Sequence, residues 1–65
     1  MSDFTISLKA ARINAELTRA EAADKIGVSE GSITNWELGR NKIGADKLKL
    51  LADAYGVPID RIVLP

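Results

Sequence analysis

The sequence predicts an all-α domain made of about five short helices. Aliphatic side chains recur at the three- and four-residue spacing of helices, and no segment alternates apolar with polar residues as a strand would. Glycine or proline separates the last four helical segments from one another. A chain of 65 residues holds one domain, and it contains no internal repeat or linker. We therefore expect residues 1–65 to form a single compact helical bundle.

The first helix is expected at about residues 5–14. Apolar residues at helical spacing would turn toward the core: Phe4, Leu8, Ala11 and Ile13. Polar residues near its start could accept hydrogen bonds from its first free amides: Ser2, Asp3 and Thr5.

The second helix should span residues 19–26, preceded by a capping box. In this pattern Thr18 accepts from the backbone amide of Glu21, and Glu21 accepts from the backbone amide of Thr18. Leu17 occupies the position of a hydrophobic staple. Small and aliphatic residues would be buried on the inner face of this helix: Ala22, Ala23 and Ile26.

The third helix is expected at about residues 30–38, with Ser29 as its cap. Gly27 should end the helix before it, because glycine adopts a left-handed conformation without a Cβ clash. Gly39 should end the third helix in the same way. Three residues would anchor this helix in the core: Val28, Ile33 and Trp36.

A loop at residues 40–44 leads to a fourth helix at about residues 45–55, which a glycine ends. Its buried face would hold Leu48, Leu51, Ala52 and Tyr55. The hydroxyl of Tyr55 should reach solvent. Pro58 is placed to start a final short helix that runs through residues 60–63.

The composition excludes several kinds of site. There is no cysteine and no histidine, which excludes disulfides and the commonest metal sites. The chain also lacks a glycine-rich phosphate loop, so we expect no enzyme, no cofactor and no metal. No apolar run is long enough to cross a bilayer, and the first residues form neither a basic leader nor an apolar signal core. The default expectation is a cytoplasmic protein that does not bind membranes.

Residues 18–39 form the minimal helix-turn-helix, in which two short helices are joined by a tight turn that contains glycine. Ala23 is small enough to let the two helix axes approach closely, and Gly27 permits the sharp turn. The N-terminal end and the outer face of the helix at residues 30–38 would remain free. A helix displayed in this way fits the width of the DNA major groove.

An ordered set of residues extends this pattern along the chain: Leu17, Thr18, Ala23, Ile26, Gly27, Val28, Ser29, Ile33, Trp36, Glu37, Gly39, Leu48, Leu51, Ala52, Gly56 and Val57. Through this set, residues 6–64 resemble the phage-repressor/Cro-like (XRE-type) helix-turn-helix family. The resemblance implies a lambda-repressor-like domain that inserts the helix at residues 30–38 into the major groove of a double-stranded DNA operator. It also implies a sequence-specific transcriptional repressor, or a closely related regulator, of bacterial or phage type that binds as a homodimer.

The resemblance gives a role to Arg12 and Glu37, which match a family pair that forms a semi-buried ion pair near the DNA backbone. The chain departs from the family at three places. Arg19 replaces a glutamine that contacts a phosphate in relatives, and an arginine could do the same by charge. Ala22 replaces the usual leucine, and the usual proline before the fourth helix is absent from residues 43–45.

Base contacts are expected from outward residues of the third helix: Glu30, Gly31, Ser32, Thr34 and Asn35. Glu30 can accept from a cytosine amino group, Asn35 can pair bidentately with adenine, and Thr34 could place its methyl against thymine. Gly31 costs a helix roughly 1 kcal/mol relative to alanine, so it either permits close approach to DNA or reflects drift at an exposed site. The alternative for the whole set is a solvated polar face.

Phosphate contacts are expected from Arg19, Ser29, Arg40, Asn41 and Lys42. Nine basic and nine acidic residues leave the chain without net charge, whereas many nucleic-acid binders are basic. The run from Arg40 to Lys42 contains no acid and would give this neutral chain a basic edge. Ser29 could serve as a helix cap, as a contact, or as both.

The same fold could instead be a protein-binding module that docks onto a toxin, an antirepressor or another regulator without binding DNA. The neutral charge, together with Glu30 and Gly31 at the end that would face the groove, favours this alternative.

The candidate surface for a homodimer is the C-terminal stretch. Its apolar residues exceed what one short helix can bury: Ile59, Ile62, Val63 and Leu64. The chain could equally be a fragment of a longer regulator whose dimerisation or sensor domain is missing.

Overall fold

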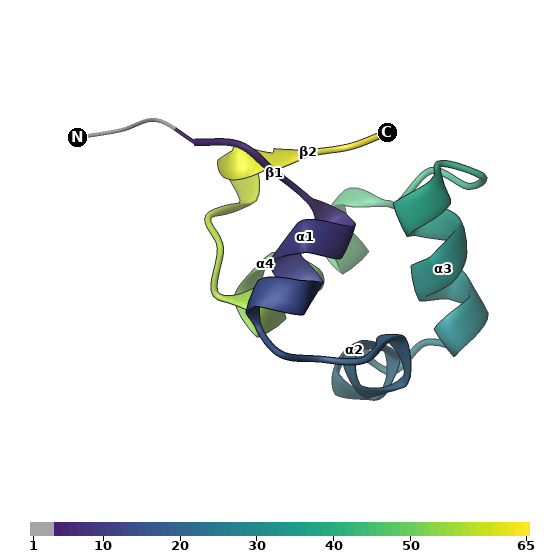
Figure 1. Cartoon of the computed structure of the whole chain (residues 1–65). Helices are drawn as coiled ribbons and strands as arrows, with labels where there is room; N and C mark the ends of the chain where they lie inside the picture. Colours follow the sequence, from purple (N-terminus) through teal and green to yellow (C-terminus); the bar gives the residue numbers. More distant parts are fainter. Residues whose placement is uncertain (1–3) are drawn as a thin grey trace.

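The computed structural model describes residues 4–65, and short α-helices make up most of this part of the chain. The helices span Leu8–Asn14 (α1), Arg19–Ile26 (α2), Glu30–Leu38 (α3) and Ala45–Tyr55 (α4). A 3-10 helix follows at Ile59–Arg61 (η1), and two-residue strands lie at Ile6–Ser7 (β1) and Ile62–Val63 (β2). Figure 1 shows the two strands together at the top of the molecule and α3 along its right-hand side. The expected all-α class is therefore confirmed, with the strands as a small addition.

The boundaries of α2, α3 and α4 agree with the sequence-based expectations. Side-chain caps explain where α2 and α3 begin, whereas Gly44 gives α4 no side-chain cap. The Thr18 side chain accepts from the amide of Glu21 at 3.0 Å, and the Glu21 carboxylate accepts from the amide of Thr18 at 2.8 Å. The Ser29 hydroxyl accepts from the amide of Ser32 at 3.2 Å. The three helices end at Gly27, Gly39 and Gly56, all with φ between 71° and 75°. Residues that have a Cβ atom rarely adopt this left-handed backbone conformation.

The two chain ends differ from the expectation. Residues 6 and 7 are extended, so α1 begins at Leu8 and not at residue 5; its cap is Ser7, whose hydroxyl accepts from the amide of Ala10 at 3.1 Å. Of the caps expected there, Thr5 lies before the strand, while Ser2 and Asp3 lie outside the described residues. The expected last helix is reduced to η1, because β2 continues from it and pairs in parallel with β1.

The core lies where the four α-helices meet. Its buried apolar residues are Leu8, Ala11, Ala22, Ala23, Ile33, Leu51, Ala52 and Tyr55. Ala22 and Ala23 expose 0% and 3% of their surface, and α2 packs against both α3 and α4. Alanine at these two positions lets the helices approach closely, so this core has no counterpart of the leucine that is usual in relatives at the position of Ala22.

Phe4 and Ile13 were expected in the core, and the structure shows that this expectation is wrong. They are 47% and 54% exposed. Because residue 4 precedes a strand and not a helix, the helical spacing that assigned Phe4 to the buried face does not apply to it. The guanidinium of Arg61 lies 5.6 Å from the centre of the Phe4 ring, which places a cation over its face.

Tyr55 is a core residue, as expected, but its hydroxyl does not reach solvent. The residue is 7% exposed, and its buried hydroxyl forms no hydrogen bond within residues 4–65. Burial, together with the nearby carboxylate of Glu37, raises the pKa of Tyr55 to about 12. The side chain enters the core from the last turn of α4, so the hydroxyl points inward with the ring.

We expect Tyr55→Phe to leave the free energy of unfolding at neutral pH unchanged or to raise it by up to about 1 kcal/mol, because the change removes an unsatisfied buried hydroxyl. Ionisation adds a second effect, since the phenol titrates near 10.0 when unfolded and at about 12 when folded. The neutral form is favoured by folding, so the parent chain should lose stability as the pH rises between these two values.

Urea denaturation of both chains at neutral pH and midway between the two pKa values measures both effects. The stability difference between the chains should grow in favour of the variant as the pH rises. A variant that is clearly less stable at neutral pH would show instead that the hydroxyl makes a favourable contact.

Candidate nucleic-acid interface

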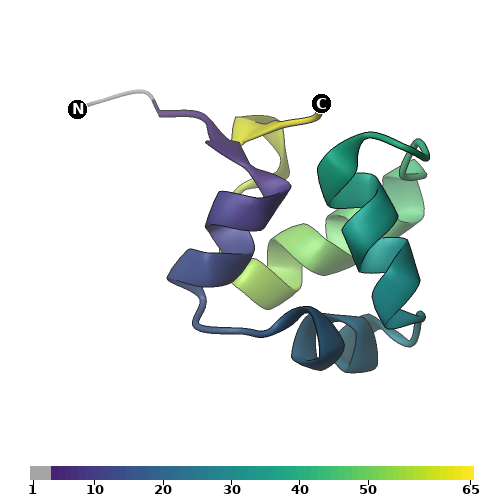
Figure 2. The same ribbon diagram turned by 45° about the vertical axis from the view of Figure 1, so that its right-hand side comes forward.

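The helices α2 and α3 form a helix-turn-helix. Figure 2 shows α3 along one side of the molecule, with α2 lying across its lower end. The turn between them is held by Gly27 in the left-handed region and by the amide of Val28, which donates to the carbonyl of Ala23 at 3.0 Å. Ile33 anchors α3 with 1% exposure, and Trp36 packs partly buried against the same core. The two helices therefore hold each other in a fixed orientation.

All five residues that we expect to contact bases lie on α3. Glu30 and Gly31 are exposed, and Ser32, Thr34 and Asn35 are partly exposed. Two of the hydroxyls already have local partners: the Thr34 hydroxyl donates to the carbonyl of Glu30 at 3.3 Å, and those of Ser29 and Ser32 lie 3.0 Å apart. The side chains of Glu30 and Asn35 are the groups on this helix best suited to direct base contacts.

Gly31 is not required by the fold. A Cβ placed at this position would meet only the Ser29 hydroxyl oxygen, at 3.9 Å, and its backbone conformation is the ordinary one of a helix. Glycine at this position costs helix stability without relieving a clash inside the described chain. The absence of a side chain leaves the backbone of α3 open to close approach from outside.

The loop after α3 carries the expected basic edge. The exposed residues of this loop are Arg40, Asn41 and Lys42. The backbone amide of Arg40 donates a hydrogen bond to the carbonyl of Asn35 at 2.9 Å. The C-terminal residues lie against this loop, because a Cβ on Gly39 would meet Pro65 at 3.1 Å. A cavity of about 390 Å³ lies between them, lined by Trp36, Gly39, Asn41, Lys42, Ile43, Leu64 and Pro65.

A buried carboxylate joins α1 to α3. The Nε of Arg12 donates to Oε2 of Glu37 at 2.7 Å, and a terminal amino group of Arg12 donates to Oε1 at 3.4 Å. The same guanidinium donates to the carbonyl of Leu17 at 2.9 Å. The side chains of Arg12 and Glu37 are 10% and 2% exposed. The ion pair that the family resemblance implied is therefore present, and the hydrogen bond with Glu37 raises the pKa of Arg12 against the opposing effect of burial.

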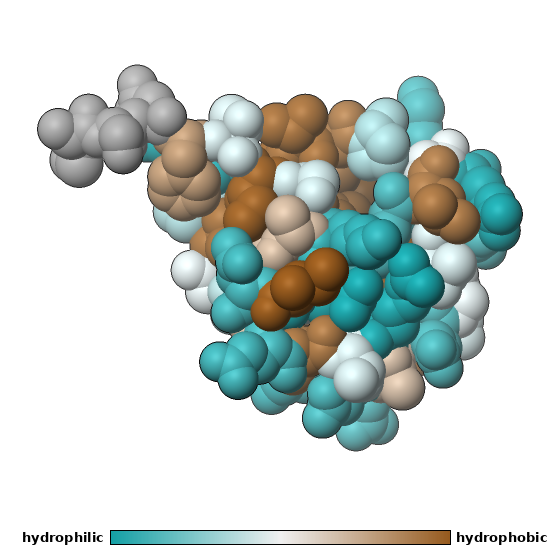
Figure 3. Space-filling view, viewed as in Figure 1, coloured by the Kyte–Doolittle hydropathy of each residue, from teal (hydrophilic) through white to brown (hydrophobic). Residues whose placement is uncertain are grey.

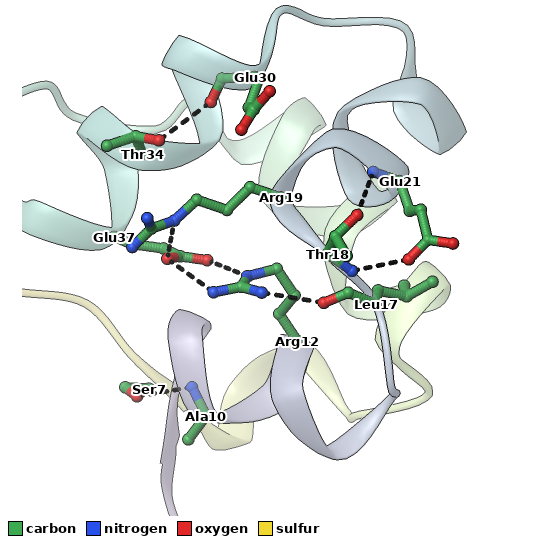
Figure 4. A network of polar contacts seen from close by, with 10 residues as sticks. All are labelled: Ser7, Ala10, Arg12, Leu17, Thr18, Arg19, Glu21, Glu30, Thr34 and Glu37. Atoms are coloured by element: carbon green, nitrogen blue, oxygen red, sulfur yellow. Dashed lines mark hydrogen bonds and ion pairs between the residues drawn. The ribbon is translucent and has the colours of Figure 1, made fainter.

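Arg19 joins the same carboxylate. Its Nε donates to Oε1 of Glu37 at 3.1 Å, and its side chain is 33% exposed. Figure 4 shows Glu37 between the two arginines, with Arg12 reaching it from α1 and Arg19 from the start of α2. Sequence reasoning placed Arg19 only at a phosphate and missed this contact. The departure from the family's glutamine was the one available indication, because arginine is long enough and charged to reach a carboxylate.

The three residues Arg12, Glu37 and Arg19, which we call the arginine–glutamate cluster, connect three helices. A carboxylate buried to this degree needs a partner, and removing one member of such a pair costs roughly 3 kcal/mol. Glu37 keeps a second arginine when either arginine is lost, whereas the loss of Glu37 leaves both guanidiniums uncompensated. Glu37 is therefore the member on which the orientation of α3 depends most.

Polar and apolar side chains are unevenly distributed on the face drawn in Figure 3. In Figure 3 hydrophilic side chains dominate the face over α2 and α3, whereas apolar ones gather along the top, over the two strands. Three of the four residues expected to form a dimer surface are exposed: Ile59 by 43%, Val63 by 50% and Leu64 by 43%. The fourth, Ile62, is partly buried against the core.

Within residues 4–65, no group of three or more histidine, cysteine or acidic side chains is close enough to hold a metal ion. None of the helices in this range is long and apolar enough to cross a membrane.

The family model described as "Helix-turn-helix" matches residues 8–62. This range begins with α1 and ends within β2, so it includes all four α-helices and the arginine–glutamate cluster. A comparison with curated proteins found no match. The match and the arrangement of α2 and α3 agree with the resemblance that the ordered residues indicated. The chain belongs to the helix-turn-helix family, of the Cro/C1 (XRE) type.

Proposed function

We propose that this domain binds double-stranded DNA in a sequence-specific way and regulates transcription, as a repressor that occupies an operator. The observation that carries the proposal is the display of α3. Its inner side is held by Ile33 and by the buried Glu37, while its outer side presents polar residues and an unneeded glycine. A rigidly held helix with a free polar face is the element that enters the major groove in helix-turn-helix domains.

Base selectivity would depend mainly on Glu30 and Asn35. A carboxylate accepts a hydrogen bond from the amino group of cytosine, and an amide pairs with two groups of adenine. Ser32 would supply a hydroxyl to a base edge, and Thr34 a methyl group against thymine. Gly31 would let the backbone of α3 come close to the DNA. These five residues lie within six consecutive positions of one helix, so they would contact neighbouring base pairs.

The phosphate contacts would lie at the two ends of α3 and at the start of α2. Ser29 caps the N-terminus of α3, and Arg40, Asn41 and Lys42 follow its C-terminus. Arg19 is the first residue of α2. Contacts at these points would orient α3 along the groove and supply most of the affinity without selecting a sequence. They would also let a chain without net charge bind DNA, since the run from Arg40 to Lys42 contains no acid.

We further propose that two copies bind one operator as a homodimer. Domains of this type contact half-sites about one helical turn apart, roughly 34 Å. The exposed apolar residues Ile59, Val63 and Leu64 belong to η1, β2 and the residue after β2. Leu64 also lines the cavity beside the loop after α3. These residues would form the contact between the two copies.

A selection from a random duplex library with the purified chain, at about 100 mM salt, tests the proposal. We expect enrichment of an inverted repeat with fixed spacing, because a symmetric dimer places two α3 helices on the same side of the duplex. Asn35→Ala should lose preference at one position in each half-site, with a cost of about 1–3 kcal/mol for the correct base. Enrichment of a lone half-site would retain the DNA function and reject the dimer.

The alternative function, a protein-binding module of the same fold, is favoured by the zero net charge and by the exposed Glu30 at the start of α3. The same selection separates the two functions. Failure to bind any duplex, even at low salt where phosphate contacts are strongest, would reject DNA binding and favour a protein partner for this face.

Gly31→Ala should change the stability of the domain and its affinity for DNA in opposite directions. Alanine is the better helix residue by about 1 kcal/mol, and the position has room for a methyl group, so the free energy of unfolding should rise. The affinity for the selected duplex should fall, because the methyl group would hold the α3 backbone away from the DNA. Urea denaturation and fluorescence anisotropy measure the two effects. Ala20→Gly on the exposed side of α2 is a control that changes stability in the opposite direction outside α3. A more stable variant with unchanged affinity would show that Gly31 has no role in binding.

A further inference from the structure

The arginine–glutamate cluster has a net charge of one positive unit, because one guanidinium is enough to compensate its single carboxylate. It contains two guanidiniums and one carboxylate, and both Arg12 and Glu37 are enclosed, with side-chain exposures of 10% and 2%. Arg12 holds Glu37 through two hydrogen bonds and also donates to the carbonyl of Leu17. Arg12 alone can therefore neutralise the carboxylate, and the surplus charge belongs to Arg19.

Arg19 can take a second acceptor without leaving Glu37. Its contact with Oε1 of Glu37 uses the Nε–H, and its terminal amino groups hydrogen-bond to no other residue in the described chain. The side chain is 33% exposed, about three times as much as that of Arg12. A guanidinium is planar and carries five N–H donors. The two terminal amino groups of Arg19, which do not bind Glu37, can therefore donate two parallel hydrogen bonds to two oxygens of one anion.

We propose that Glu37 is a positioning residue for DNA binding, which holds the Arg19 fork so that its terminal amino groups bind a phosphodiester of the DNA backbone. The inference rests on the proposed function. Glu37 would act through Arg19 and would not contact DNA itself. A long arginine side chain that is already ordered loses less conformational entropy when it binds a phosphate. The charge of Arg19 remains available because Arg12 compensates Glu37.

If Glu37 positions Arg19, its removal changes DNA affinity in the direction opposite to that expected for the loss of an acid. Loss of a carboxylate near a DNA-binding surface raises the net charge by one and normally strengthens binding, most of all at low salt. Here Glu37→Gln should weaken binding although the protein becomes more basic. The variant frees Arg19 to adopt many rotamers and leaves the buried Arg12 without its partner. A decrease in affinity with an increase in positive charge is a result that simple electrostatics does not predict.

The test compares Glu37→Gln, Arg19→Gln and Asp24→Asn. Asp24 is the matched control, because it is an exposed acid on α2 whose loss gives the same change in charge outside the cluster. The affinity for the duplex that the parent chain selects is measured between about 50 and 200 mM salt. Arg19→Gln should reduce the slope of log affinity against log salt by about 0.9, the value for one phosphate contact.

Glu37→Gln should bind at least about threefold more weakly than the parent chain at 100 mM salt, with a similar loss of slope. Asp24→Asn should bind as tightly as the parent chain or slightly more tightly. A folded Glu37→Gln protein that binds as well as the parent chain, or an unchanged slope for Arg19→Gln, would overturn the proposal. If the parent chain binds no duplex at all, the proposed function fails first, which is a different outcome.

A further variant covers the case in which Glu37→Gln does not fold, as circular dichroism would show. Arg19→Lys keeps the charge and leaves Arg12 paired with Glu37, so it should fold. A lysine offers one compact ammonium group, which can face Glu37 or the phosphate but lacks the fork that serves both. We expect at least about a threefold loss of affinity. Equal affinity for Arg19→Lys and the parent chain would overturn the positioning role of Glu37.

Discussion

The carboxylate of Glu37 is 2% exposed, and the arrangement of three helices depends on how it is compensated. Arg12 binds it from α1 and Arg19 from α2, while Glu37 itself belongs to α3. A charge at this depth is unfavourable unless it is paired and hydrogen-bonded. The packing of α3 is therefore coupled to the positions of α1 and α2, and the helix that displays the polar face cannot rotate without breaking these contacts.

The core beneath this cluster is thin, and small residues make it close-packed. Alanines at residues 22 and 23 let α2 approach α3 and α4, and Ile33 and Leu51 fill the centre. Since such a core supplies little apolar area, the caps, the glycine helix ends and the pairing of β1 with β2 add stabilising contacts. Two features oppose it: the unsatisfied hydroxyl of Tyr55 and the glycine inside α3. The first is enclosed in the core, whereas the second lies on the surface where a partner could use it.

The sequence was sufficient where structure follows from local rules. The limits of α2 and α3 follow from the capping box at Thr18, the cap at Ser29 and the glycines after each helix. It was not sufficient where distant segments meet. Strands of two residues are too short to show alternation, so neither β1 nor β2 was visible, and the start of α1 was placed too early. The Arg12–Glu37 pair could be inferred only by family resemblance, and the contact of Arg19 with the same carboxylate was not foreseen.

The central claim is that the outer face of α3 contacts DNA, and amide chemical-shift mapping tests it most directly. The chain, labelled with ¹⁵N, is titrated with a duplex that carries one half-site, so that dimerisation does not add shifts of its own. We expect the largest changes at the amides of Glu30 to Asn35, with further changes at Arg19 and at Arg40 to Lys42. Binding that leaves the amides of residues 30–35 unchanged would contradict the account, because the DNA would then occupy another face of the molecule.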